Sequence, residues 1–365
     1  MAFEDVKKKL GFGCMRLKMD GDQVDYNEFN KMIDAFIGAG FNYFDTAHGY
    51  IDGKSEIAIG KCLSARYNRE DFILADKLSD WYFEKEEDIV PLFESQLEIC
   101  GVEYFDFYLF HCLTRKSYPK HKECNSFEIV QKLKEQGKIK HIAMSFHDTA
   151  DILDMILTEQ PCIEAVQLQI NYLDYDDPGV QSKACYDVAV KHGKKVIVME
   201  PVKGGALVNL PQKAEQVLNN LGGGSYASYA LRYAASYPEV FMVLSGMGNM
   251  DMMLDNISTF ADFEPLNEEE LKATDRVREI IREVRQIPCT GCNYCAEVCR
   301  NSIPISELFA IRNKFLAAKI TAGQAKEEFP KDKPAAAACV KCGCCEAVCP
   351  QGIKIIEELE KISKM

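Results

Sequence analysis

Cysteines near the C-terminal end of the sequence form two groups with the same internal spacing. Each group reads Cys-x2-Cys-x2-Cys-x3-Cys, which brings four thiolates into one short loop. The eight residues are Cys289, Cys292, Cys295, Cys299, Cys339, Cys342, Cys345 and Cys349. Thiolates at this spacing ligate [4Fe–4S] clusters, so the sequence predicts two such clusters and one-electron chemistry.

The shape of a cubane cluster predicts how the thiolates divide. Three cysteines at two-residue gaps can hold three iron corners, and the fourth is directed to the partner cluster. One cluster is expected to be held by Cys289, Cys292, Cys295 and Cys349, and the other by Cys339, Cys342, Cys345 and Cys299. Cys344 lies between ligands and is expected not to bind iron. Structural zinc is the alternative, but zinc sites use paired CxxC or Cys/His sets rather than two matched runs.

A second group of polar residues lies at the ends of predicted strands, where barrel enzymes place their active sites. These residues are Asp45, Tyr50, Lys77 and His111. A tyrosine can give a proton to a developing alkoxide if its pKa falls from about 10, and a neighbouring ammonium would lower that pKa. Asp45 would hold the ammonium, and His111 could orient the substrate oxygen. Taken singly, these residues could instead be an ion pair, a loop aromatic and a core histidine.

The segments around these residues predict a (β/α)8 barrel. Eight apolar runs rich in β-branched and aromatic residues are expected to be strands, at 11–17, 41–47, 72–78, 105–111, 139–146, 165–171, 195–201 and 240–246. Helical spacing alternates with them, at 26–38, 55–66, 85–100, 126–136, 149–159, 180–193, 225–236 and 250–260. Eight such units in roughly 250 residues fit a closed parallel barrel. A doubly wound open sheet is disfavoured, because residues 11–16 end in Arg16 and do not complete a dinucleotide fingerprint.

The charged stretch 267–285 is expected to be a helix that links two domains. We predict a barrel with its linker helix at 1–287 and a small α-helical, ferredoxin-like iron–sulfur domain at 288–365. Within that domain, helices are expected at 306–319 and 353–362, and residues 331–338 form a Pro/Ala-rich connector. The iron–sulfur segment carries 11 Lys and Arg against 9 Asp and Glu, although the whole chain has a net charge of −13.

Composition excludes several classes of function. A net charge of −13 argues against nonspecific nucleic-acid binding, which needs a basic face. No run approaches the roughly 18–20 apolar residues that span a bilayer, and the start has no long apolar segment typical of a signal peptide. Sixteen cysteines without such a signal indicate metal rather than disulfides, so a cytoplasmic protein is expected.

The barrel resembles the aldo/keto reductase family. The resemblance covers roughly residues 10–285 and is carried by Phe44-Asp45-Thr46-Ala47-His48-Gly49-Tyr50, Gly53-Lys54-Ser55-Glu56, Asp76-Lys77 and Leu109-Phe110-His111. It implies that Asp45, Tyr50, Lys77 and His111 are a catalytic tetrad. It also implies NADPH or NADH across the barrel mouth, with the carboxamide held by Ser145 and Gln167 and the ribose above the loop of Gly13 and Met15. Further cofactor contacts are implied at Met199, Pro201, Gly246, Asn249 and Asn256.

Three positions depart from the family pattern. Phe146 replaces the Asn that commonly follows the serine after the fifth strand, and Met199 stands where an aromatic usually stacks on the nicotinamide. Met252 occupies the position of an Arg that typically holds the 2′-phosphate. The sequence therefore indicates no strong preference for NADP.

Three functions are compatible with these motifs. The first is a nicotinamide-dependent carbonyl reductase or alcohol dehydrogenase that is coupled to the clusters. Hydride carries two electrons and each cluster one, so the second is a reductase linked to a flavin or to an external carrier such as ferredoxin or flavodoxin. In the third, the chain is a non-catalytic electron carrier or redox sensor. The substrate of either enzyme would be a small carbonyl compound or alcohol.

Overall fold

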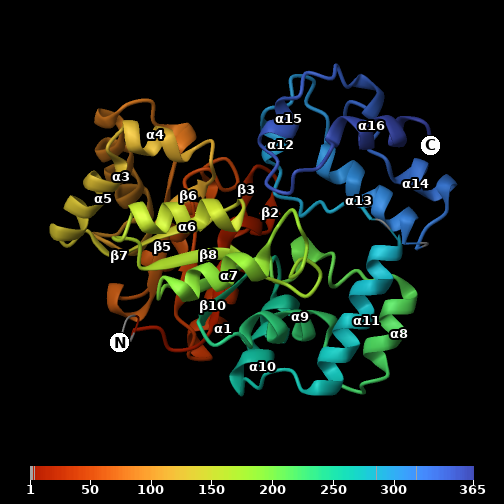
Figure 1. Ribbon diagram of the computed structural model, residues 1–365, viewed down its shortest axis with the longest axis horizontal. Helices are drawn as coiled ribbons and strands as arrows, with labels where there is room; N and C mark the ends of the chain where they lie inside the picture. Colours follow the sequence, from red (N-terminus) through yellow and green to blue (C-terminus); the bar gives the residue numbers. More distant parts are fainter. Residues whose placement is uncertain (1–2, 4, 285, 318) are drawn as a thin grey trace. The chain divides into compact units, whose positions relative to one another are not determined.

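A closed barrel of eight parallel strands forms the first part of the chain (Figure 1). The computed structural model describes residues 3, 5–284, 286–317 and 319–365. The strands neighbour one another in the order β1-β10-β9-β8-β7-β6-β5-β4, and the ring then closes on β1. Their bounds are β1 (Leu10–Gly13), β4 (Tyr43–Asp45), β5 (Ile73–Ser79), β6 (Phe105–Leu113), β7 (Ile139–Phe146), β8 (Ala165–Gln169), β9 (Lys195–Met199) and β10 (Val240–Ser245). The predicted (β/α)8 architecture and all eight strands are confirmed.

Helices follow the strands where helical spacing predicts them. They are α1 (Tyr26–Gly38), α2 (Lys54–Ile59), α3 (Glu86–Cys100), α5 (Ser126–Glu135), α6 (Ala150–Glu159), α7 (Ser182–Lys191), α9 (Tyr226–Ala235) and α10 (Met250–Ala261). Figure 1 shows α6 and α7 running along the outside of the strands. Between the first and last strands of the barrel, two further short helices were not predicted, α4 (Tyr118–Glu123) and α8 (Gln212–Asn219).

The first strand and the second helix end well before their predicted ends and pass into other conformations. The first strand stops at Gly13 and passes into a 3-10 turn at Cys14–Arg16, followed by the hairpin of β2 (Met19–Asp20) and β3 (Gln23–Val24). The helix expected at 55–66 ends at Ile59 and continues as a π-helical segment, Gly60–Ser64. A Cβ on Gly60 would lie 2.3 Å from the Ile99 carbonyl oxygen, so a glycine is needed where this turn passes α3.

The chain divides into two compact units. The first contains residues 1–170, 174–201 and 231–265, and the second contains 171–173, 202–230 and 266–365. The second unit holds α8, α11 (Glu268–Val284) and the cysteine motifs, and α8 lies against α11 (Figure 1). The linker helix predicted at 267–285 is thus found, although Arg285 lies outside the described residues. The helices predicted at 306–319 and 353–362 correspond to α13 (Ile305–Leu316) and α16 (Ile355–Ser363).

Short helices and a small apolar core shape the cysteine-rich part of the second unit. The helices α12 (Tyr294–Glu297) and α15 (Cys344–Ala347) lie next to each other, and α14 (Ala322–Glu328) packs on α13. The core contains isoleucines, leucines and a phenylalanine from both motifs, among them Ile303, Ile305, Phe309, Ile355 and Leu359. In the part of the chain that the structure describes, no helix combines the length and apolarity that a membrane crossing requires.

Candidate functional site

A buried lysine at the carboxyl end of β5 is the centre of the barrel site. The Lys77 ammonium donates hydrogen bonds to Asp45 Oδ1 at 2.7 Å and to the Thr46 carbonyl oxygen at 2.6 Å. It lies 4.9 Å from the centroid of the Tyr50 ring and donates a hydrogen bond to the Tyr50 hydroxyl. The structure therefore brings three of the four predicted residues into direct contact.

Parallel register explains why these residues meet. Asp45 is the last residue of β4, and Lys77 lies two residues beyond Ala75, its register partner on β5. Tyr50 follows in a turn whose next residues, Ile51, Asp52 and Gly53, have positive φ. Within this loop the Thr46 and Ser55 hydroxyls lie 2.7 Å apart, and Ser55 also donates to the Cys14 carbonyl. These hydrogen bonds fix the loop so that Tyr50 lies over the lysine.

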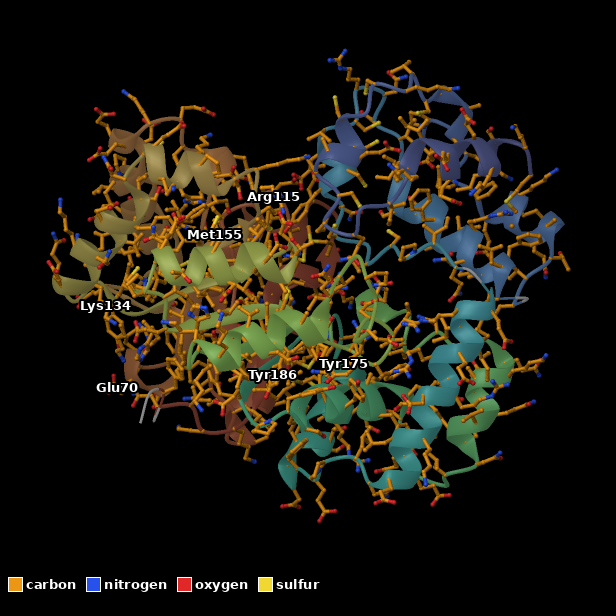
Figure 2. The ribbon with its side chains drawn as sticks, in the orientation of Figure 1. Glu70, Arg115, Lys134, Met155, Tyr175 and Tyr186 are labelled. Atoms are coloured by element: carbon orange, nitrogen blue, oxygen red, sulfur yellow. The ribbon has the colours of Figure 1, made fainter. Side chains whose placement is uncertain are left out.

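His111 completes the group from β6. Its ring centroid lies 5.9 Å from that of Tyr50. The register between β6 and β7 shifts between Phe110 and Leu113, and Cys112 has a φ of +54°. A bulge of this kind re-aims side chains at the end of a strand. The loop beyond it contains Arg115, which Figure 2 labels. The Arg115 backbone N–H donates to the Asp148 carboxylate at 2.7 Å and so holds this loop.

Burial governs the protonation of the tyrosine. The pKa of Tyr50 is raised because the phenol is buried, and the nearby Lys77 ammonium offsets only part of this effect. The expected net fall of this pKa is therefore wrong. Burial opposes the Lys77 ammonium too, but Asp45 and Tyr50 outweigh it and raise the pKa of Lys77. The site consequently contains a charged ammonium hydrogen-bonded to a neutral phenol, which is a proton donor at neutral pH.

The histidine is neutral. Burial, reinforced by the positive charge of Lys77, lowers the pKa of His111 well below its ordinary value. His111 Nδ1 lies 2.6 Å from Ser79 Oγ, and the two residues are register partners on β5 and β6. If the serine hydroxyl donates to Nδ1, the proton of the neutral ring is on Nε2, where it can be donated to a substrate oxygen.

Ser79 is a residue that the sequence analysis missed. It lies two positions after Lys77 on one strand, and residues at that spacing share a face. This period-two relation could have identified it. The Trp81 ring, 5.1 Å from the His111 ring, was missed as well, and no local pattern distinguishes it.

We expect Ser79→Ala to change the tautomer of His111 while the other residues of the site stay in place. The imidazole would lose the partner that selects its tautomer, so kcat should fall roughly tenfold to a hundredfold while the fold remains intact. Ser79→Thr keeps the hydroxyl and should recover most of the activity. The tautomer can be followed by 15N NMR of the imidazole, and an unchanged spectrum in Ser79→Ala would contradict this role.

Two buried carboxyl groups lie behind the lysine, on the other side of β5. Side-chain ligand atoms of Glu56, Asp76 and Cys100 all lie within 4.8 Å of one another. Glu56 accepts from Gln96 Nε2 at 3.1 Å and lies 2.8 Å from His48 Nδ1. Burial and the adjacent Glu56 raise the pKa of Asp76 well above its ordinary value. Asp76 therefore retains its proton and donates it in a hydrogen bond to Glu56.

This pair makes stability depend on pH. A carboxyl group whose pKa is raised by folding stabilises the protein fully below its unfolded pKa of about 3.9, and this contribution is lost as pH rises towards the folded value. Asp76→Asn keeps a donor and cannot ionise, so its melting temperature should gain on the parent as pH rises from 5 to 8. Asp22→Asn, at an exposed position, is the control. Parallel pH curves for the parent and Asp76→Asn would refute this protonation state.

Two of the residues implied to bind a nicotinamide lie side by side on neighbouring strands. Ser145 and Gln167 are register partners on β7 and β8. Gln167 Oε1 is buried and has no hydrogen-bond partner among the described residues, whereas Ser145 Oγ accepts from the Cys112 N–H at 2.7 Å. A carboxamide would supply the donor that Gln167 lacks. Gly13 and Met15 end β1 and occupy the following turn, and Met199 and Pro201 follow at the end of β9.

The two asparagines of this set already make structural hydrogen bonds. Asn249 caps α10, where its side chain accepts from the Met252 N–H at 3.0 Å, and Asn256 donates to Ser245 Oγ at 2.7 Å. Gly246 packs beside the Arg16 side chain. The Met250 N–H at the start of α10 donates to the Glu28 carboxylate at 3.0 Å. This helix N-terminus, a favourable place for a phosphate, thus already has an anionic side chain.

The cysteines of both motifs lie within the second unit, and several of their thiols are near neighbours. The buried Cys295 has four cysteines among its electrostatic neighbours. Cys292, Cys289 and Cys349 belong to its expected ligand set, and Cys345 belongs to the other set. Cys299, Cys339, Cys342 and Cys345 line a single hollow. The thiols of the two motifs thus lie near one another, and their division between two clusters stays a prediction. Cys299 Sγ also accepts from the Ile303 N–H at 3.4 Å, a bond of the type that tunes cluster potentials.

Comparison with known proteins separates the two parts of the chain. Residues 9–279 match the aldo/keto reductase family, and residues 286–353 match the 4Fe-4S dicluster domain. The chain is 23% identical to the uncharacterized oxidoreductase YqkF of Bacillus subtilis over 73% of its length and 90% of that protein. It is 25% identical to Protein REDOX 2 of Catharanthus roseus over 68% of its length and 78% of that protein.

Solved structures share the barrel. The holo form of the aldo-keto reductase AKR11C1 from Bacillus halodurans superposes with a TM-score of 0.62 and 24% identity, over 74% of this chain and 92% of that one. An aldo/keto reductase from Klebsiella pneumoniae, solved with NADP and acetate, gives a TM-score of 0.60 and 21% identity, over 74% and 91%. At these identities the likeness establishes the fold.

Proposed function

The chain belongs to the aldo/keto reductase family across residues 9–279, and on this premise we propose that it interconverts a small carbonyl compound and its alcohol. The observation that carries the proposal is the buried Lys77, which contacts both the Asp45 carboxylate and the Tyr50 phenol. If Lys77 and Asp45 formed only a structural ion pair, no phenol would be required beside the ammonium. The iron–sulfur domain, which we place at 288–365, exchanges electrons with this chemistry.

Each residue of the site has a distinct role in the proposal. Tyr50 donates its proton to the oxygen that becomes the alcohol, and the Lys77 ammonium stabilises the phenolate that remains. Asp45 holds the ammonium in place through the 2.7 Å hydrogen bond. Neutral His111 donates from Nε2 to the same substrate oxygen and so orients the carbonyl.

A nicotinamide cofactor fits the barrel in part. When bound, it would supply a hydride to the carbonyl carbon. Gln167, with its orphan buried oxygen, and Ser145 would hold the carboxamide, and Gly13 and Met15 would lie under the ribose. The Glu28 carboxylate at the start of α10 repels a phosphate there, which together with Met252 favours NADH over NADPH.

The same carboxylate supports a second candidate, a reductase that draws its electrons from the clusters instead of from NAD(P)H, directly or through a flavin. Carbonyl reduction consumes two electrons and two protons. Two cubanes store one electron each, which equals the requirement of one turnover. Eight cysteines in two matched groups, held by the domain that matches the dicluster family, support two clusters rather than one. Reduced cysteines and cluster ligands also favour a cytoplasmic location.

Anaerobic purification followed by two titrations tests the proposal. Iron, sulfide and flavin are measured on one sample, and about eight irons per chain are expected. NADH or NADPH should bleach the visible cluster absorbance of flavin-free protein if the first candidate holds, whereas only a one-electron donor should do so if the second holds. In either case, a panel of aldehydes and ketones should reoxidise the reduced clusters. Reduced protein that none of them reoxidises would refute catalysis and leave an electron carrier.

A further inference from the structure

The two cysteine motifs are repeats that lie fifty residues apart. Cys289 corresponds to Cys339, and the isoleucine pair Ile303 and Ile305 corresponds to Ile353 and Ile355. In both copies the second isoleucine begins a helix and donates its N–H to the carbonyl of the first, at 2.8 and 2.9 Å. The repeats therefore share backbone geometry, and any difference in exposure between their clusters has a local cause.

The first loop is covered and the second is open. Thr290, which follows the first cysteine of its motif, is 2% exposed, whereas Val340 at the equivalent position is 61% exposed. Cys292 is partly buried, but its counterpart Cys342 is exposed. Within the second unit the cover over Thr290 is the backbone of Gly204. A Cβ there would lie 2.0 Å from the Thr290 carbonyl oxygen.

The open motif is surrounded by apolar and cationic groups. The hollow that holds Cys299, Cys339, Cys342 and Cys345 is also lined by Arg300, Lys341 and Val340, and no carboxylate lines it. Lys341 pairs with Glu360, while no salt bridge involves Arg300 in the described part of the chain. An exposed valine beside a guanidinium that acts electrostatically on the Cys342 thiol forms a small apolar patch with a positive edge.

We propose that the cluster held by Cys299, Cys339, Cys342 and Cys345 is the electron port of the protein, and that an acidic one-electron carrier protein docks on it. The inference rests on the proposed function, because it presupposes both clusters. In each encounter the reduced carrier would lose one electron, and the outer cluster held by these cysteines would gain it. Cys289, Cys292, Cys295 and Cys349 would hold an inner cluster that accepts this electron, so two encounters would load the pair.

Charge complementarity selects the partner. A carrier with acidic groups around its redox centre would meet Arg300 and Lys341, and long-range attraction between such faces raises association rates by factors of roughly 10–10³ at low salt. In the alternative explanation, the same cations only offset the negative charge of the thiolate-bound cluster. In that case Arg300 and Lys341 would change the reduction potential of the cluster, and the charge of the carrier would not affect the rate of reduction.

Stopped-flow reduction of the anaerobic holoprotein separates these readings. The variant is Arg300→Glu, and the control is Lys326→Glu, which reverses an exposed cation on α14 outside the hollow. Two reductants of opposite charge are used, a reduced acidic ferredoxin and the methyl viologen radical cation. Arg300→Glu should slow the ferredoxin reaction roughly tenfold at low salt and accelerate the viologen reaction. Lys326→Glu should change both by less than about twofold.

The outcomes are distinct. Equal changes with both reductants, accompanied by a shifted cluster potential, would show that Arg300 only offsets the charge of the cluster, and would overturn the proposal. So would an Arg300→Glu protein whose ferredoxin rate and salt dependence equal those of the parent. A preparation without iron would instead refute the proposed function, because the clusters themselves would be missing. If the clusters are intact and carbonyl turnover is present, but Arg300→Glu leaves the rate of reduction by ferredoxin unchanged, only the proposed electron port is refuted.

Discussion

Replacing Tyr50 with Phe is expected to lower kcat for carbonyl reduction by a factor of roughly 10²–10⁴, the range associated with loss of a general acid. The substitution removes the hydroxyl that contacts Lys77 and leaves the ring in place. The alkoxide then has no proton donor of comparable position. Since the ring and its packing remain, the melting temperature should change little.

A second buried tyrosine provides the control. Tyr43 lies on β4 two residues before Asp45, and its hydroxyl has no hydrogen-bond partner among the described residues. Tyr43→Phe therefore removes a buried hydroxyl from the same strand without touching the proposed chemistry, and kcat should stay within about twofold. A Tyr50→Phe enzyme with full activity would exclude the phenol as proton donor. Activity of the parent should also stay level from pH 6 to 9, because burial raises the pKa of Tyr50 and the phenol keeps its proton throughout this range.

Replacing Cys342 with Ala is expected to abolish turnover that is driven by a one-electron donor. Cys342 is a proposed ligand of the outer cluster and is exposed, so the substitution removes a thiolate without opening the apolar core. Iron should fall below eight per chain by one to four atoms, depending on whether a three-iron cluster survives. The electron paramagnetic resonance spectrum of the reduced protein should lose the signal of one cubane and the coupling between the two.

The neighbouring cysteine gives the matched control. Cys344 lies in the same loop and is expected not to bind iron, so Cys344→Ala should retain about eight irons, both cubane signals and donor-driven turnover. Equal iron loss in the two variants would mean that the loop, rather than a particular thiolate, determines assembly. If Cys344→Ala alone lost a cubane, the ligand assignment would be wrong.

The two chemistries proposed for this chain match in electron count. Interconversion of an alcohol and a carbonyl compound moves two electrons, and two cubanes hold two. This agreement in electron count can be inferred from the sequence motifs alone, because both sets of four cysteines are complete and all four residues of the tetrad are present. Two features of the structure bear on nicotinamide binding. The buried oxygen of Gln167 has no hydrogen-bond partner among the described residues, and the Glu28 carboxylate lies at the start of α10.

Local patterns carried most of the prediction of fold. Alternating strand and helix periodicities identified all eight strands of the barrel, and α1 begins and ends where its spacing predicts. Such patterns are readable because each depends on residues within one turn or one strand of each other. The cysteine spacing is readable for the same reason. The elements that were missed are short or irregular, such as α4 and the π-helical turn at Gly60–Ser64, which α3 approaches closely at Gly60.

Properties that depend on long-range contacts could not be read from the chain. Spacing brought Tyr50, Lys77 and Asp45 to one end of a barrel, but the direction in which the Tyr50 pKa moves depends on how completely the folded barrel excludes water. The hydrogen bond from Ser79 to His111 joins two strands, and the cover of Gly204 over Thr290 joins segments more than eighty residues apart. Two motifs of identical spacing therefore differ in exposure. Burial is a property of neighbours that are distant in sequence, and folding alone brings those neighbours together.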